Sequence, residues 1–294
     1  MLIKKFSEKV YGNGSIIYPS KNKELLKLDS RKITSIFQEK GVILFRNFRS
    51  KKEKLTEFTD RFTKKYANDA YRREKKFNNK HIKTVDEGNK EMPLHSEASY
   101  SPSWPEIIWF YCNKAPKKSG FTTLCDGKKV YKNLKTKTKE YFLSNQIIYN
   151  LKIPYGDVKK KGERKLKRWL IDSPGVIDCK IDLNNRIIYF KQKRYAIIKT
   201  KYSSDLAFAN HLQIILNRDP QVLGHKMENY NKIPKEIKDD YVKVCSKYTE
   251  KIFWEKGDLI MIDNQRFMHG RTKILANEDR DIVNIQTLET KLNT

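Results

Sequence analysis

The sequence has few cysteines, and none of them are closely paired. Cys112, Cys125, Cys179 and Cys245 are scattered along 294 residues without a Cys-x-x-Cys motif. This spacing excludes a zinc knuckle, and a chain of this length does not need a disulfide scaffold to fold. We therefore expect reduced and mostly buried thiols.

Long apolar runs are also missing. The opening stretch MLIKKFSEKVYGNG has no apolar run of the kind that a signal peptide needs. Nowhere do about 18 apolar residues follow one another, as a membrane-spanning helix requires. No repeat or low-complexity linker divides the chain, and 38% hydrophobic content can bury one sizeable core. These features predict a cytoplasmic protein with one domain spanning residues 1–294, and no membrane partner.

Acidic residues are scarce relative to basic ones. The chain has 35 Asp and Glu against 62 Lys and Arg, which gives a net charge of +27. Such a charge attracts nucleic acid, anionic surfaces or acidic proteins. The lysines are spread over the whole chain, and the densest run, residues 159–168, reads as a loop-like cluster followed by Trp169. A solvated lysine-rich surface is the favoured interpretation, and a non-catalytic basic nucleic-acid or protein-binding module is the alternative.

Short apolar runs bounded by Gly, Pro, Asn or Asp predict strands, at residues 41–48, 106–112, 186–190, 257–263 and 281–287. Helical patterns occupy residues 30–40 after Asp29 or Ser30 as a cap, 51–66, 127–143 and 234–251. The helices do not alternate with the strands. We therefore expect a mainly β fold with flanking helices, a sandwich or a jelly roll.

The stretch MPLHSEASY, residues 92–100, places His95 two positions before Glu97. It reads as extended, and residues i and i+2 of a strand project to the same face, so both side chains could bind one ion. A His-x-Glu pair by itself is more often structural. Holding a divalent metal requires a third donor, and His269 offers one after the predicted strand 257–263. Two histidines and one carboxylate leave positions on iron free for a co-substrate and dioxygen.

Two further features suit a co-substrate carboxylate. Arg280 lies about one strand and one turn beyond His269, and a guanidinium can grip a carboxylate through two hydrogen bonds. A surface arginine is the alternative there. The segment SGFTTLCD, residues 119–126, reads as a tight turn before a strand, in which a threonine either supplies a hydroxyl or only favours the strand.

From about Gly41 onward the chain resembles the taurine-dioxygenase (TauD/TfdA) and clavaminate-synthase superfamily of iron(II), 2-oxoglutarate-dependent oxygenases. Within it, the chain is most similar to the branch that contains the syringomycin-cluster amino-acid hydroxylase. The motifs that carry the resemblance are residues 93–100, Trp104-Pro105, 109–112, Gly120, Thr122, Leu124, Asp126, 254–258, 263–264 and 269–271.

The resemblance implies a double-stranded β-helix, a distorted jelly roll with a cupin-like core. It implies Fe(II) bound by His95, Glu97 and His269, with 2-oxoglutarate at Arg280 and Thr122 and O2 as the oxidant. The glutamate disfavours halogenation, because halogenase relatives have a small residue there. The chain departs from the family pattern at Ser119, in place of a glycine, and in the longer connection before Arg280.

The resemblance also implies an amino acid or a derivative as the small-molecule substrate. We expect a partly helical insertion around residues 127–255 to cover the site, with Asn210 and His211 near the substrate. Tyr100 and Arg271 adjoin the metal ligands and could meet a substrate carboxylate. A structural histidine is the alternative for His211, and a structural ion pair for Arg271.

The predicted function is hydroxylation of an unactivated C–H bond of an amino-acid-like metabolite in natural-product biosynthesis, with release of succinate and CO2. The substrate is either free or tethered to an acidic carrier protein, which the net charge would attract. The alternative is desaturation, epoxidation or cyclisation with the same cofactors. The wide spacing of the ligands argues against a demethylase that acts on nucleic acid, and the sequence leaves the oligomeric state open.

Overall fold

The computed structural model describes residues 1–5, 14–49, 52–67, 73–85, 88–154, 160–217, 225–227 and 232–292. Its largest sheet has nine strands in the order β1-β2-β3-β17-β8-β19-β6-β5, with β4 also paired to β19. These strands are β1 (Leu2–Lys5), β2 (Ser15–Tyr18), β3 (Val42–Phe45), β4 (Thr63–Tyr66), β5 (Lys75–Lys76), β6 (Asn79–Thr84), β8 (Ile107–Lys114), β17 (Leu259–Asp263) and β19 (Asp281–Thr290).

A second sheet of four strands lies against the first. Its order is β16-β9-β18-β7, formed by β16 (Thr249–Lys251), β9 (Thr122–Asp126), β18 (Phe267–Arg271) and β7 (Met92–His95). A buried apolar cluster drawn from both sheets fills the space between them, including Leu44, Phe110, Ile260, Leu124 and Phe267. Two sheets packed around such a core form the expected jelly roll.

The central strands of the large sheet are buried on both faces. In β8, Ile108 and Phe110 point into the core between the two sheets, whereas Ile107 and Trp109 point to the opposite face. The period of two along a strand produces this division, and burial on both sides explains the nearly continuous apolar run. Each large apolar side chain buried in this way contributes about 1.5–3 kcal/mol of transfer free energy.

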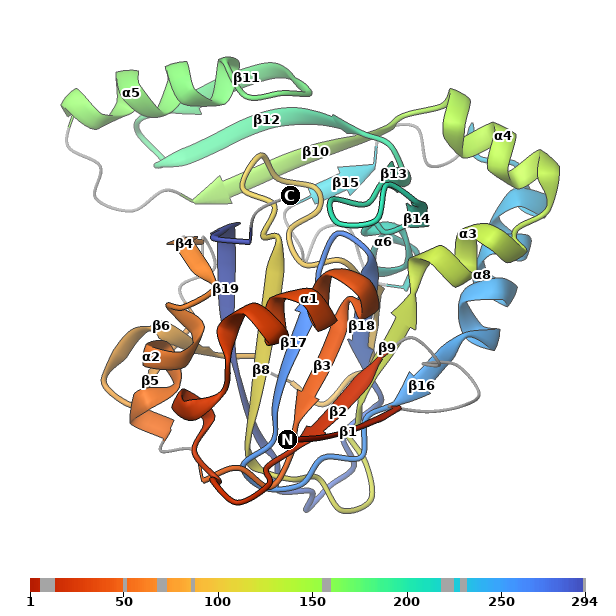
Figure 1. Ribbon diagram of the computed structural model, residues 1–294. Helices are drawn as coiled ribbons and strands as arrows, with labels where there is room; N and C mark the ends of the chain where they lie inside the picture. Colours follow the sequence, from red (N-terminus) through yellow and green to blue (C-terminus); the bar gives the residue numbers. More distant parts are fainter. Residues whose placement is uncertain are drawn as a thin grey trace.

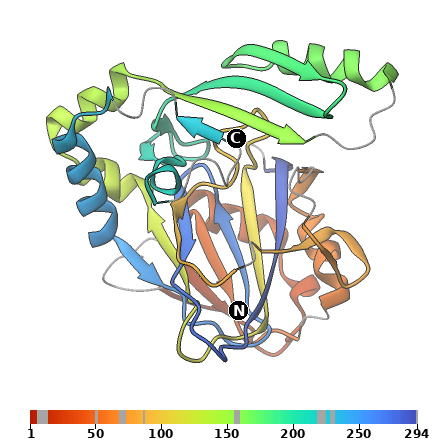
Figure 2. The same cartoon turned by 180° about the vertical axis from the view of Figure 1, so that it is seen from behind.

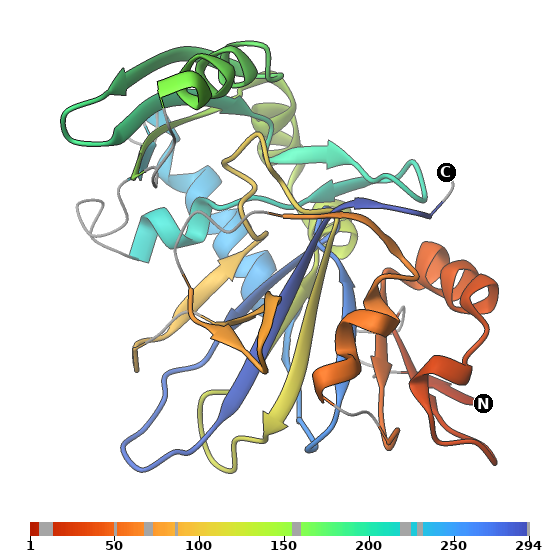
Figure 3. The same cartoon turned by 90° about the vertical axis from the view of Figure 1, so that its left-hand side faces the viewer.

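Helices cover the outer face of the large sheet, as Figure 3 shows. They are η1 (Leu25–Lys27), α1 (Ser30–Lys40), η2 (Lys52–Lys54) and α2 (Leu55–Thr59). Asp29 caps α1, because its carboxylate accepts hydrogen bonds from the backbone N–H groups of Arg31 and Lys32. The predicted helix at 30–40 and its cap are confirmed.

Residues after β9 form a lobe above one end of the two packed sheets (Figures 1 and 2). A third sheet has the order β11-β12-β10-β15, and β13 pairs with β14. The elements are α3 (Gly127–Asn133), α4 (Thr136–Ser144), β10 (Ile147–Pro154), α5 (Lys160–Ile171), β11 (Val176–Asp182), β12 (Ile187–Arg194), β13 (Ile197–Lys199), β14 (Leu206–Phe208), α6 (Leu212–Asn217), β15 (His225–Met227) and α8 (Lys235–Lys247). We call residues 127–248 the lobe.

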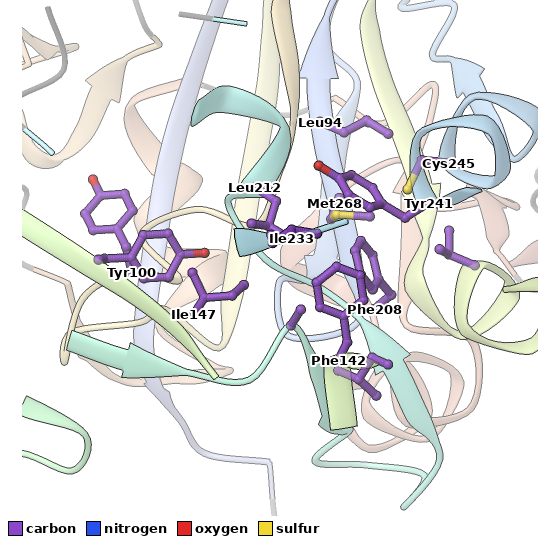
Figure 4. Close-up of a cluster of buried hydrophobic side chains, with 14 of the residues drawn as sticks. Leu94, Tyr100, Phe142, Ile147, Phe208, Leu212, Ile233, Tyr241, Cys245 and Met268 are labelled. Carbon is purple, nitrogen blue, oxygen red and sulfur yellow. The ribbon is translucent and has the colours of Figure 1, made fainter. Parts of the chain in front are cut away.

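The lobe packs on the outer face of the small sheet. Figure 4 shows Leu94 of β7 and Met268 of β18 among lobe side chains such as Phe208 and Tyr241, and all four residues belong to one buried cluster. The two strands are therefore covered by apolar side chains on this face. In the part of the chain that the structure describes, no helix is both long and apolar enough to cross a membrane.

Three predicted helices differ from the structure. The pattern at 51–66 gives only a short helix, and Thr63–Tyr66 forms β4 because it pairs with β19. The pattern at 127–143 breaks at Leu134, whose backbone is extended, and becomes α3 and α4. The pattern at 234–251 ends as a helix at Lys247, and the following residues pair with β9. Tertiary pairing outweighs helix propensity at both strand segments.

The basic run predicted as a loop is helical instead. Residues 160–171 form α5, since Lys, Arg, Glu and Leu are good helix formers. Residue 159 lies outside the described residues.

Candidate active site

His95 and His269 face each other on neighbouring strands. They are direct cross-strand partners of the antiparallel pair β7–β18, and the centroids of their imidazole rings are 4.4 Å apart. Gly270 allows this approach, because a Cβ there would lie 2.5 Å from the carbonyl oxygen of Met92. The glycine therefore lets β18 come close enough to β7 for both rings to share one ion.

Glu97 is not on the strand that carries His95. The strand β7 ends at His95, and Glu97 begins a turn in which Ala98 has a φ of 52°. The prediction that both residues lie on one strand is therefore wrong. Asn264 fixes the glutamate instead: its Oδ1 accepts from the Glu97 N–H at 2.8 Å, and its Nδ2 donates to the Glu97 carbonyl at 3.0 Å.

The three side chains converge at one point. Glu97 Oε2 lies 3.5 Å from His95 Nε2 and 3.8 Å from His269 Nε2, and all three residues are buried. First-row metals bind nitrogen and oxygen ligands at about 2.0–2.2 Å, so one ion fits among these atoms. The Nδ1 of His95 lies 2.9 Å from the Pro93 carbonyl, and donation there leaves the Nε2 lone pair available. Among the described residues, this is the group of His, Cys, Asp or Glu side chains that can hold a metal.

The charge state of the group suits a divalent cation. Burial and the neighbouring His95 lower the pKa of His269 to about 4, although Glu97 opposes this shift. Burial alone would raise the pKa of Glu97, but Arg73 and the two histidines outweigh it and hold that pKa well below its usual value. At neutral pH, His269 is therefore neutral and Glu97 is ionised, as metal ligands must be.

Arg280 and Thr122 lie in the same cavity as the three candidate ligands. The Nε of Arg280 is buried and has no hydrogen-bond partner among the described residues. Burial and the nearby Arg271 lower the pKa of Arg280 to about 10. The Thr122 hydroxyl accepts a hydrogen bond from Trp254 Nε1 at 3.0 Å, which leaves its own hydrogen to donate elsewhere. Both groups are therefore able to hold a carboxylate.

Gly120 makes room for this arginine. Its φ is 72°, and a Cβ there would lie 3.0 Å from the Cδ of Arg280. A side chain at this position would be strained and would press on the guanidinium arm. The departure from the family pattern at Ser119 leaves the essential glycine in place.

The cavity encloses about 460 Å³, counted with its open mouth. Apolar side chains form part of its wall, and the candidate ligands, three arginines, a threonine and an asparagine form much of the rest. The lining residues are Arg73, Val85, Met92, His95, Glu97, Ile108, Phe110, Thr122, His269, Gly270, Arg271, Arg280, Ile282 and Asn284.

One of the predicted substrate residues, His211, lies beside a candidate ligand, and a second, Tyr100, lies beside His211. The ring of His211 is 5.3 Å from that of His95, and the ring of Tyr100 is 4.7 Å from that of His211. Arg271 lines the cavity and donates from Nη2 to the carbonyls of Gly88 and Lys90. The structure thus brings Arg271 into the cavity and His211 next to His95, while contact of Tyr100, His211 and Arg271 with a substrate stays a prediction.

The Asn210 side chain makes structural hydrogen bonds within the lobe. Its Nδ2 donates to the Ala196 carbonyl at 3.2 Å, and its Oδ1 accepts from the Leu212 N–H at 3.0 Å, at the start of α6. Its carbonyl accepts from the Ser96 N–H at 2.9 Å. Asn210 therefore joins the lobe to the residue between the two candidate ligands, and a role in substrate binding stays a prediction.

Sequence reasoning missed Arg73 and the role of Asn264. Arg73 precedes β5, and its Nη2 lies 3.1 Å from Glu97 Oε1. No local pattern distinguishes this arginine from the other basic residues. Asn264 directly follows the strand β17, and its position after Asp263 in a matching motif was the available signal.

The donor set fits iron and a 2-oxoacid. Two imidazoles and one carboxylate suit a ferrous ion with open positions. The buried Arg280 Nε lacks a partner among the described residues, and a carboxylate of a bound co-substrate would supply one.

Comparison with known proteins gives a consistent result. The family model described as "Taurine catabolism dioxygenase TauD, TfdA family" matches residues 11–286. A 3-((Z)-2-isocyanoethenyl)-1H-indole synthase from Fischerella ambigua (strain UTEX 1903) is 22% identical over 206 residues, which are 68% of this chain and 64% of the relative. The chain thus spans less than two thirds of that protein.

Solved structures share the fold. The PvcB protein from Pseudomonas aeruginosa superposes with a TM-score of 0.61 at 13% identity, over 93% of this chain and 85% of that chain. A second PvcB structure, described as an Fe, alpha-ketoglutarate dependent oxygenase from an isonitrile synthetic pathway, gives 0.60 at 14% identity over the same shares. AAD-2 in complex with Mn(II) and N-oxalylglycine gives 0.63 at 14% identity, over 97% of this chain and 96% of that chain.

Proposed function

This chain belongs to the taurine catabolism dioxygenase TauD, TfdA family, and from that premise we propose that it is an Fe(II)- and 2-oxoglutarate-dependent oxygenase. The observation that carries the proposal is the convergence of His95, Glu97 and His269 beside a buried arginine, Arg280, whose Nε lacks a partner among the described residues. Iron, when bound, would supply the activation of dioxygen, coupled to conversion of 2-oxoglutarate to succinate and CO2.

The three converging side chains would hold the iron. His95 Nε2, Glu97 Oε2 and His269 Nε2 are the ligand atoms in this proposal, because these atoms face one another. The Pro93 carbonyl fixes the ring of His95, and Asn264 fixes the backbone of Glu97. These contacts hold the donors in place before the ion arrives, which reduces the cost of ordering them.

Arg280 and Thr122 would orient 2-oxoglutarate. The guanidinium provides charge-assisted donors for the remote carboxylate, and the Thr122 hydroxyl adds another donor. Phe110 packs edge-on to His269 with the ring centroids 5.2 Å apart, and Met92 and Ile108 also line this space. These apolar side chains exclude water, and so they strengthen the electrostatic contacts of the co-substrate.

The substrate is an anionic, amino-acid-like small molecule in this proposal. Arg73, Arg271 and Arg280 line the cavity, whereas Glu97 is the one acidic residue of the described lining. Ferrous iron and doubly charged 2-oxoglutarate cancel each other, so the cavity keeps an excess of positive charge that favours a substrate carboxylate. Tyr100 and His211 are the proposed contacts on the side of His95.

The relatives favour natural-product biosynthesis. PvcB is described as part of an isonitrile synthetic pathway, and the relative from Fischerella makes an isocyanoethenyl indole by its name. We propose hydroxylation of an amino-acid-derived metabolite as the reaction. The ethenyl group in the relative's name contains a carbon–carbon double bond, which favours desaturation as the second candidate. The finer resemblance to the syringomycin-cluster branch stays a prediction.

An acidic carrier protein and a cytoplasmic location belong to the proposal as well. The net charge of +27 supports the first. The cytoplasmic location stays a prediction. Binding of the carrier should weaken steeply as the salt concentration rises, because surface charges are screened beyond about 10 Å at 0.1 M salt; carrier affinity that does not respond to salt would count against this partner.

An anaerobic titration of Fe(II) and 2-oxoglutarate tests the cofactor proposal. The wild type should develop the visible charge-transfer absorption of the chelate, and Glu97→Ala and His269→Ala should lose it. His81→Ala is the matched control, because His81 stacks on Tyr66 outside the site and its loss should leave the band unchanged. A wild type without the band, under conditions in which it binds neither partner, would overturn the proposal.

Arg280→Gln distinguishes binding of the co-substrate from binding of the metal. A hydrogen bond to a charged group is worth about 1.5–3 kcal/mol, so the Kd for 2-oxoglutarate should rise by about 10- to 150-fold. Fe(II) binding in the absence of 2-oxoglutarate should be unchanged, because Arg280 is not a candidate ligand. Arg280→Lys keeps the charge and should lose less affinity; an unchanged Kd in Arg280→Gln would exclude this arginine from the co-substrate site.

A further inference from the structure

One oxygen of the Glu97 carboxylate is already occupied by the protein. Arg73 Nη2 donates to Oε1 at 3.1 Å, while Oε2 is the oxygen that faces both histidines. Both partners are largely buried, since each side chain is 11% exposed. The contact is therefore not a surface ion pair of the kind that solvent competes away.

The two residues come from different sheets. Glu97 follows β7 of the small sheet, whereas Arg73 precedes β5 at the edge of the large sheet. Asn264 holds the backbone of Glu97, but its side-chain bonds go to backbone groups and not to the carboxylate. Oε2 faces the two histidines, whereas Oε1 accepts from Arg73. The guanidinium therefore fixes the rotation that decides which oxygen faces the ion.

This rotation matters because a carboxylate can bind a metal through one oxygen or through two. Three protein donors leave three positions on a six-coordinate ion, and a second glutamate oxygen would remove one of them. A bidentate co-substrate takes two positions, so dioxygen needs the third. A glutamate that chelates through both oxygens would close the position that the chemistry requires.

We propose that Arg73 is a positioning residue that keeps Glu97 a one-oxygen ligand, and so keeps three positions of the metal open. This inference rests on the proposed iron site. Arg73 also lines the cavity, so its positive charge lies in the same space as the candidate ligands. Its effect on the geometry of the ligand therefore has to be measured separately from its effect on affinity.

Water-proton relaxation of the Mn(II)-loaded protein, without 2-oxoglutarate, tests the inference. The relaxation enhancement per bound Mn(II) scales with the number of exchangeable waters on the ion. In Arg73→Met, the second oxygen of Glu97 should displace one of about three waters, and the enhancement should fall by about one third. Arg73→Lys keeps a donor for Oε1 and should restore the wild-type value. A loss of fold would lower the amount of bound Mn(II), but not the enhancement per bound ion.

The outcomes distinguish the two proposals. A wild-type protein that binds no Mn(II), or that binds it equally well after Glu97→Ala, would overturn the metal site itself. A wild type that loses Mn(II) in Glu97→Ala, together with an Arg73→Met protein of unchanged enhancement, would overturn the role of Arg73 alone. If Arg73→Met does not fold, Arg73→Gln replaces it, because its shorter amide should not reach Oε1, and the same decrease is expected.

Discussion

The two packed sheets and the lobe are built differently. β17 and β18 are buried along their whole length, and the ion pair Asp126–Arg266 between β9 and the turn before β18 is almost inaccessible, at 1% and 2% exposure. In the lobe, β11 is half exposed, and the ion pair Arg168–Asp172 has side chains that are 87% and 68% exposed. The strands of the two sheets beside the candidate site are thus closed to water, whereas α5 and β11 of the lobe are exposed to it.

This difference corresponds to the two parts of the proposed function, which are cofactor binding and substrate binding. Every candidate ligand of the metal and of 2-oxoglutarate lies in or beside the two sheets, where packing leaves little freedom. The lobe reaches the site through its segment at Asn210 and His211, where the Asn210 carbonyl accepts from the Ser96 N–H. We call the two packed sheets the framework. A rigid framework that binds the cofactors, with a separate lobe at the substrate side, allows the substrate to change without disturbing the chemistry.

The largest expected effect comes from breaking the buried ion pair of the framework. Asp126→Ala leaves Arg266 without the carboxylate to which its Nε and Nη2 donate at 3.1 and 2.7 Å. An unpaired buried charge costs about 3–5 kcal/mol, so the free energy of unfolding should fall by that amount in urea titrations. Asp172→Ala, which breaks the exposed pair of the lobe, should cost no more than about 0.5 kcal/mol. Equal losses in the two variants would remove the contrast between the regions.

A smaller effect should appear as a pH dependence of the free energy of unfolding. Burial raises the pKa of Asp263 to about 7, although Arg266 opposes this shift. Because the folded protein holds this proton more tightly than the unfolded chain, the stability that it provides is complete below about pH 4 and is lost as the pH rises through 7. A pKa that differs by one between the folded and unfolded protein corresponds to about 1.4 kcal/mol, so the loss between about pH 5 and 8 is on the order of 3 kcal/mol.

Asp263→Asn isolates this contribution. The amide keeps the Oδ1 acceptor for the Gln265 N–H and does not titrate. In urea titrations, the free energy of unfolding of the variant minus that of the wild type should rise as the pH increases from 5 to 8. A stability difference that stays constant over this range would show that Asp263 does not carry the dependence.

The smallest of these effects tests the segment of the lobe whose Asn210 carbonyl bonds the Ser96 N–H. Asn210→Ala removes the bonds to the Ala196 carbonyl and to the Leu212 N–H, and should lower the free energy of unfolding by about 1–2 kcal/mol. Asn210→Asp keeps the acceptor for Leu212 and should recover part of the loss. The charge-transfer band with Fe(II) and 2-oxoglutarate should persist in both variants, because neither bond touches the cofactor residues. Loss of the band would mean that the lobe also shapes the metal site.

The strands of the framework were predictable from the sequence because both of their faces are buried. The apolar runs at 106–112, 257–263 and 281–287 correspond to β8, β17 and β19. The helix after Asp29 was predictable for a local reason, since its cap lies within three residues of the groups that it satisfies. The segment at 63–66 was predicted as a helix, because nothing local reveals its pairing with β19.

The sequence by itself determined the chemical types at the candidate site: two histidines, one glutamate, an arginine and a threonine, in motifs that resemble one family. Only the tertiary structure decided how they meet. Glu97 reaches the histidines through a turn held by Asn264, and Arg73 reaches Glu97 from the edge of the other sheet. Local pattern records what the neighbouring backbone requires, whereas the contact between Arg73 and Glu97 depends on how the two sheets pack, and no local pattern marks it at Arg73.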